Sequence, residues 1–161
     1  MLFILEVEPA TRAEFTPQNS IEGISARALA HVGRLLNRPI ETALDLAEVT
    51  RKGVSPELMT VLIDSGFTRP EVDWIVPPRT LSHRRQNGRP LTANETGCFL
   101  RAVKIRAMAE AVLGNSEAAL AWLRKPRRSF GGISAMELLQ TEAGGQVVEE
   151  SLGQMDEGYS A

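Results

Sequence analysis

The stretch that decides the fold is the C-terminal part of the chain, residues 119–161, which reads ALAWLRKPRRSFGGISAMELLQTEAGGQVVEESLGQMDEGYSA. An apolar segment is stopped there by Pro126, because proline cannot continue a helix. The pair Gly131-Gly132 predicts a turn with positive φ angles. Ser134-x-x-Glu137 predicts the next helix start, because the two side chains can satisfy free backbone N–H groups reciprocally. After a break at 141–144, one more short apolar helix is expected.

Similar helix-start signals occur upstream of this stretch. Thr68-x-x-Glu71 and Thr92-x-x-Glu95 have the same spacing, and Ser55-Pro56 combines an N-cap with proline at the first helical position. Helix ends are expected at Gly53, Gly66, Gly88, Gly114, Pro126 and Gly153. Apolar residues between these signals recur at helical spacing, and no sustained alternating strand pattern occurs. The sequence therefore predicts an all-α fold, with helices over 22–36, 41–52, 56–65, 69–76, 78–86, 93–113, 116–124, 135–141 and 145–152.

Length and composition exclude several classes of protein. A chain of 161 residues with 43% hydrophobic residues can bury a core, yet no run approaches the 18 apolar residues that a membrane span needs. Residues 1–7 are apolar but lack the basic start of a signal peptide. Cys98 is the only cysteine, which excludes an internal disulfide and fits a reducing cytoplasm. With only two histidines as well, we expect no zinc site and no cofactor.

The net charge of −2 hides an uneven distribution of charge along the chain. Residues 69–128 carry twelve Lys/Arg against five Asp/Glu, whereas residues 129–161 carry six Asp/Glu and no Lys or Arg. The middle of the chain therefore suits a polyanion, and the C-terminal part suits a basic partner surface. Ordinary solvated helix faces are the alternative interpretation of both charge runs.

The three short segments 56–65, 69–76 and 78–86 have the order and spacing of a helix-turn-helix. Its small core is expected from Leu62, Val72, Ile75 and Leu81. In such a motif the third helix lies in the major groove, where arginine pairs with guanine and Ser or Thr contact bases or phosphates. The candidate DNA-binding residues are Arg79, Thr80, Ser82, His83, Arg84, Arg85 and Arg89. A basic three-helix bundle that contacts no nucleic acid remains the alternative.

Residues 119–161 resemble the toxin-binding domain of the Xre/MbcA/ParS-type antitoxins, whose members read roughly A-x-x-W-L-x-x-P-x-x-x-L-G-G-x-x-P-L-E-L-L-x-T-E-x-G-x-x-x-V. Residues 75–96, IVPPRTLSHRRQNGRPLTANET, resemble the family's I-P-x-R-T-L-x-R-R…L-x-x-x-E-S. The chain departs from these patterns at His83, where a second basic residue is usual, and at Cys98, where arginine is common. Phe130 replaces a leucine and Ala135 a proline.

The resemblance implies an antitoxin of a type II toxin–antitoxin system. Its expected partner is a RES-domain toxin that consumes NAD+, and the C-terminal end of the antitoxin packs against the toxin and closes its active-site cleft. A homodimer within a larger toxin–antitoxin complex is expected to bind a palindromic operator and to repress the operon. The residues assigned to toxin contact are Arg127, Arg128, Glu150, Met155, Asp156, Glu157, Gly158, Tyr159, Ser160 and Ala161. For Arg127 and Arg128, DNA contact remains the alternative.

The expected organisation is an Xre/Cro-like helix-turn-helix domain followed by a small helical toxin-binding domain. Its parts are a poorly ordered arm (1–20), a helical packing or dimerisation segment (21–52), the helix-turn-helix domain (53–113) and the toxin-binding domain (114–161). An enzyme is not expected, because His31 and His83 lack a paired acid or nucleophile and no phosphate-binding loop occurs. Two other functions stay open: a stand-alone dimeric transcriptional regulator, and a toxin-binding adaptor without DNA binding.

Overall fold

The computed structural model describes residues 21–159; the predicted arm 1–20 and the last two residues lie outside them. The described part is helical and contains no strand, which confirms the all-α prediction. Its elements are α1 (Ile21–Leu35), α2 (Ala43–Lys52), the 3₁₀ turn η1 (Pro56–Leu58), α3 (Met59–Asp64), α4 (Arg69–Val72), α5 (Pro78–Gln86), α6 (Ala93–Leu113), α7 (Ser116–Arg124), the 3₁₀ turn η2 (Arg128–Phe130), α8 (Ala135–Leu138) and α9 (Glu142–Tyr159).

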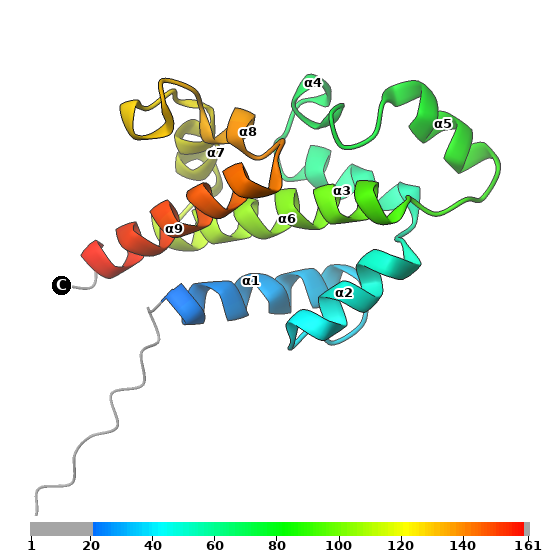
Figure 1. Ribbon diagram of the computed structural model, residues 1–161, viewed down its shortest axis with the longest axis horizontal. Helices are drawn as coiled ribbons and strands as arrows, with labels where there is room; N and C mark the ends of the chain where they lie inside the picture. Colours follow the sequence, from blue (N-terminus) through cyan, green and yellow to red (C-terminus); the bar gives the residue numbers. More distant parts are fainter. Residues whose placement is uncertain (1–20, 160–161) are drawn as a thin grey trace, which may run out of the picture.

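Helix α6 is the centre of the molecule (Figure 1). Its apolar residues are not confined to one stripe, which is typical of a helix that is covered on several sides. Phe99, Ile105 and Ala109 are almost fully buried within it. Helices α1 and α2 lie on one side of α6, whereas α4, α5, α7 and α8 lie on the other, and α9 runs beside it. One continuous apolar core therefore connects the N-terminal, middle and C-terminal helices.

The N-terminal helix pair packs against the rest of the same chain. Ile24, Ala28 and Val32 form the apolar stripe of α1, and all three are buried where α1 meets α6 and α9. For this segment the sequence left packing or dimerisation open. Packing is what the structure contains, and the homodimer stays a prediction.

The helix starts predicted from capping motifs are confirmed. Thr68, Thr92 and Ser134 each form a complete capping box with the glutamate three residues later, and Ser55 caps η1. A further box, Thr42 with Asp45, was not predicted because its third residue is aspartate instead of the usual glutamate or glutamine. Local sequence therefore fixes where most of these helices begin.

The prediction for the last helix was wrong at both ends. It was expected over 145–152 with a stop at Gly153 and a separate tail, but α9 runs from Glu142 to Tyr159. Thr141 caps it by accepting a hydrogen bond from the Gly144 N–H at 3.0 Å. Gly153 is buried within this helix. Glycine has a low helix propensity, but the packing of the neighbouring Leu152 against the core outweighs it. The supposed tail is thus the last part of a helix.

Candidate functional site

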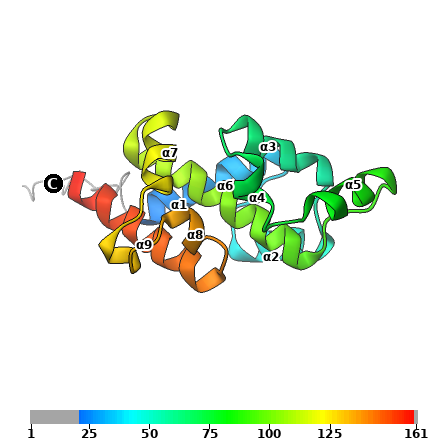
Figure 2. The same ribbon diagram turned by 90° about the horizontal axis from the view of Figure 1, so that it is seen from above.

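Helix α5 is presented at one end of the molecule, far from the C-terminal end of α9 (Figures 1 and 2). Pro78 stands at its first turn, where the missing N–H costs nothing, and Gly88 follows its end with a φ of 59°. Leu81 turns inward and packs, half-buried, against the core that contains Leu62, Val72 and Ile75. The small core predicted for the helix-turn-helix is therefore present.

The predicted DNA-binding residues fall into two groups. Arg79, Ser82, His83 and Arg89 are exposed, and Thr80 is half-buried. Arg84 and Arg85 are half-buried and bind within the fold instead. Arg85 lies 3.5 Å from Glu57 and donates to the Pro56 carbonyl. The exposed group alone is free to reach a nucleic acid.

Arg84 fixes α5 to the start of α6. Its Nη2 lies 3.0 Å from Glu95 Oε1, and its Nε lies 2.9 Å from Glu95 Oε2. Glu95 also accepts from the Thr92 N–H, so the carboxylate that caps α6 holds α5 as well. Both side chains are largely shielded from water, which strengthens this ion pair.

The C-terminal helices are organised around Trp122 at the end of α7. Its ring meets Phe130 edge to face, with centroids 5.9 Å apart. The Arg127 guanidinium lies 4.7 Å from the centre of the same ring and donates to the Trp122 carbonyl. Arg127, predicted to contact the toxin, thus has a stacking role within its own module.

The loop between α7 and α8 is closed by its own backbone. Gly131 and Gly132 have φ angles of 71° and 87°, as the sequence predicted for this turn. The Arg127 N–H donates to the Ile133 carbonyl at 3.0 Å, and the Gly132 N–H donates to the Arg127 carbonyl at 2.9 Å. Arg128 lies on this loop and is exposed.

Helix α9 has a buried and an exposed face. Val148 and Leu152 are fully buried, and Asp156 is turned toward the body with 7% of its surface exposed. Glu150, Glu157 and Gly158 are exposed, and Met155 is half-buried. Tyr159 ends the helix; Ser160 and Ala161 lie outside the described residues. Of the predicted toxin-binding acids, only Glu150 and Glu157 therefore face solvent.

Two arginines tie the C-terminal helices to the helix-turn-helix. Arg124 of α7 donates to both carboxylate oxygens of Glu71 in α4, at 2.6 and 2.9 Å. These hydrogen bonds hold the pKa of Glu71 below its ordinary value of 4.5. Arg106, buried in α6, donates to the Ser65 carbonyl and to Ser116 Oγ. Helices α4 and α7 are therefore neighbours.

Comparison with known proteins now adds to this geometry. Residues 108–158 match the family model described as the antitoxin Xre/MbcA/ParS C-terminal toxin-binding domain. A relative named "Antitoxin Xre", from Pseudomonas putida strain KT2440, is 39% identical over 157 residues, a match that covers 96% of each chain. The chain belongs to the Xre antitoxin family. The matched segment begins at residue 108, inside α6.

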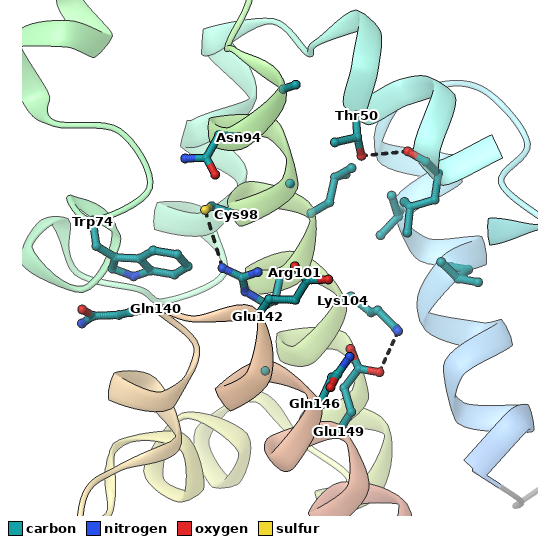
Figure 3. A pocket seen from close by; sticks show the side chains of 17 residues that line it. Thr50, Trp74, Asn94, Cys98, Arg101, Lys104, Gln140, Glu142, Gln146 and Glu149 are labelled. Carbon is teal, nitrogen blue, oxygen red and sulfur yellow. Dashed lines mark hydrogen bonds and ion pairs between the residues drawn. The ribbon is translucent and has the colours of Figure 1, made fainter. Parts of the chain in front are cut away.

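A groove of about 740 Å³ runs along the antitoxin between α1–α2 and α6–α9 (Figure 3). Arg101 crosses it from α6: its guanidinium lies 5.7 Å from the centre of the Trp74 ring, and its Nε donates to the Leu139 carbonyl. Lys104 is paired with Glu149 at 2.8 Å. These contacts join three parts of the chain and bring no nucleophile and base together.

The two histidines of the antitoxin lie on α1 and α5, on opposite sides of α6. Burial, followed by the charge of Arg34, lowers the pKa of His31, so this side chain is neutral at pH 7. Between residues 21 and 159, no group of His, Cys, Asp or Glu side chains could hold a metal ion. No helix in that range could span a membrane.

Sequence reasoning missed two exposed cations next to the helix-turn-helix. Arg69 opens α4, and Lys125 follows α7 on the loop that also carries Arg128. Arg69 lies in the predicted helix-turn-helix domain but outside its third helix, and Lys125 lies in the predicted toxin-binding domain, so neither was singled out. The hydrogen bonds of Arg124 to Glu71 and to the Gly66 carbonyl, 53 and 58 residues away in sequence, show that these segments meet.

Proposed function

We propose that this antitoxin neutralises a RES-domain toxin that consumes NAD+ and represses its own operon. The observation that carries the first activity is the match of residues 108–158 to a toxin-binding domain. The acidic exposed face at the end of α9 supports it. A cleft that binds NAD+ must attract phosphates and is therefore basic, so acidic side chains complement it.

The proposed toxin contact is the outer face of α9 from Glu150 onward; Ser160 and Ala161, assigned to the same contact from the sequence, lie outside the described residues. Glu150, Glu157 and Gly158 are exposed on it. Asp156 supports this surface from the buried side of the helix, because its side chain is turned into the body. An inhibitor of this kind acts by occupying the cleft and keeping NAD+ out, and it needs no chemistry of its own.

Operator binding is proposed for α5. The early residues of a recognition helix face the bases, and here Arg79 and Ser82 are exposed while Leu81 and the Arg84–Glu95 pair hold the helix in place. A homodimer would present α5 twice, which requires a palindromic operator. We assign base contact to Arg79 and Ser82, with His83 and Arg89 beside them.

One experiment with two readouts tests both activities. The reading frame next to the antitoxin gene is expressed with each antitoxin variant while growth and NAD+ are followed, and a reporter measures the operon's promoter. Glu150→Lys/Glu157→Lys should release the toxin, with falling NAD+, but keep repression. Arg79→Ala should lose repression, at a cost of about 1–3 kcal/mol in operator binding, but keep neutralisation.

Matched controls remove or reverse the same charges elsewhere. Glu41→Lys/Asp64→Lys reverses two exposed acids far from the end of α9, and Arg27→Ala removes an exposed cation from α1. Both should behave like the wild type in each readout. If expression of the neighbouring reading frame affects neither growth nor NAD+, the result would point to a stand-alone regulator. Neutralisation without any effect on the promoter would point to an adaptor that does not bind DNA.

A further inference from the structure

We propose that the loop between α7 and α8 binds the phosphate backbone of duplex DNA that flanks the site contacted by α5. The residues involved are Lys125 and Arg128, both exposed. The inference rests on the proposed operator binding by α5. It assigns a second ligand, DNA, to a domain whose sequence matches a toxin-binding domain. It also extends the surface that contacts DNA beyond the helix-turn-helix.

The position of the loop is the first argument. Arg124, directly before Lys125, donates to Glu71 of α4 and to the Gly66 carbonyl at 2.9 Å. In both views α4 lies between α5 and α7 (Figures 1 and 2). All of these helices lie on the side of α6 opposite α1 and α2. A duplex lying along α5 on that side would therefore extend past α4 toward the loop.

Charge is the second argument. Five exposed Lys/Arg side chains occur on these elements. Arg124 is paired with Glu71, and the other four make no ion pair with another residue in the range 21–159: Arg69, Arg79, Lys125 and Arg128. Glu71 is neutralised by Arg124. Glu137 is exposed and stays negatively charged, because the hydrogen bonds from Ser134 lower its pKa. Asp73, half-buried, and Glu117, exposed in the first turn of α7, are the other opposing acids. The unpaired cations, together with the exposed Arg89 beyond the end of α5, outnumber these acids, which favours phosphate binding.

The third argument is that the loop is held in shape before any ligand arrives. Two backbone hydrogen bonds between its ends close it, and Phe130 is buried against Trp122. The stacking of Arg127 on the ring of Trp122 adds to this. A preformed loop loses little conformational entropy when it binds, so even two phosphate contacts contribute.

Charge complementarity also favours DNA over the toxin as the ligand of Arg128. The cleft proposed for the toxin is basic because it receives NAD+, and it fits the acidic outer face of α9. Two further cations would be repelled by such a cleft. The alternatives left open by the sequence are thereby separated: Arg127 stacks on Trp122, and Arg128 is assigned to DNA.

The test measures binding of the full-length antitoxin to duplexes from its own promoter over a range of salt concentrations. One duplex carries flanks of about one helical turn on each side of the operator, and a second lacks them. Lys125→Ala/Arg128→Ala should lower the slope of log K against log salt by about 2 per protomer on the long duplex. On the duplex without flanks, the salt slope of this variant should equal that of the wild type. Arg27→Ala/Arg34→Ala, which removes two exposed cations from α1, should change neither slope.

Arg79→Ala separates failure of the inference from failure of the proposed function. If Arg79→Ala loses binding while the loop variant keeps the wild-type slope on the long duplex, the inference is overturned and operator binding stands. If the wild type binds neither duplex, both are overturned. A loop variant that binds DNA normally but no longer neutralises the toxin would also overturn it, because the loop would then belong to the toxin contact.

Discussion

At the residue scale, two glutamates each stabilise the fold in two ways. Glu71 caps α4 and pairs with Arg124, and Glu95 caps α6 and pairs with Arg84. In both cases a local cap is joined to a contact with another part of the chain. The helix starts and the arrangement of the helices therefore depend on the same carboxylates.

Glu71 should make stability depend on pH. Its pKa in the fold is lowered, chiefly by the hydrogen bonds from Arg124, so its contribution is fully present above its ordinary pKa of 4.5 and is lost as pH falls through the lower folded value. Glu71→Gln should therefore be less stable than the wild type at neutral pH, and the difference should shrink in acid. Urea unfolding from about pH 7 to about pH 3 measures this. Glu117→Gln, at an exposed acid of α7, is the control, and parallel curves for all three proteins would contradict the prediction.

The sequence could predict these caps but not the ion pairs. A capping box is recognised from residues three apart, so Thr68 and Thr92 were identified correctly. The partner of Glu71 is 53 residues away, and nothing in the spacing of either residue indicates it. For the same reason Arg84 was assigned to DNA, although the structure directs it toward Glu95.

At the element scale, the start of α9 depends on how closely it approaches its neighbours. A Cβ at Gly144 would collide with the Leu138 carbonyl of the preceding turn. A Cβ at Gly145 would lie 2.5 Å from Cδ of Arg101. The sequence predicted a break over 141–144, with the helix beginning only after it. These glycines instead allow close packing, which can be recognised only once the neighbouring elements are placed.

Gly144→Ala should destabilise the antitoxin by about 1–3 kcal/mol, because the collision is with backbone that cannot move freely. Gly158→Ala is the matched control in the same helix: nothing lies within 4 Å of its Cβ position. Alanine there should be neutral or slightly stabilising, since it favours the helix more than glycine does. Urea unfolding of both variants provides the measurement, and equal stability of the two would show that the start of α9 is not tightly packed.

At the scale of the whole molecule, α6 packs against helices from the N-terminal, middle and C-terminal parts of the chain. It contacts α1, α2, α3, α7 and α9, and a single core extends through them. The sequence predicted the helix at 93–113 correctly but did not indicate that helices from several parts of the chain pack against it. Capping signals mark where a helix begins and ends, but they do not indicate how many neighbours share its buried faces.

A fragment of residues 114–161 should therefore fail to fold by itself. Leu123, Val148 and Leu152 are buried in the intact chain, and without α6 and α1 they lose much of their cover. The full chain should unfold in one transition that is the same by circular dichroism and by tryptophan fluorescence. A fragment with a cooperative unfolding transition of its own would show instead that the toxin-binding part is an independent domain.

The shared helix α6 also has a consequence for how the antitoxin is destroyed. A protease that unfolds part of such a chain disrupts the common core, so the helix-turn-helix and the toxin-binding face are lost in the same event. Under the proposed function, no degradation product would keep the operon repressed after the toxin has been released. The cell would regain synthesis of the antitoxin at the moment when it loses protection.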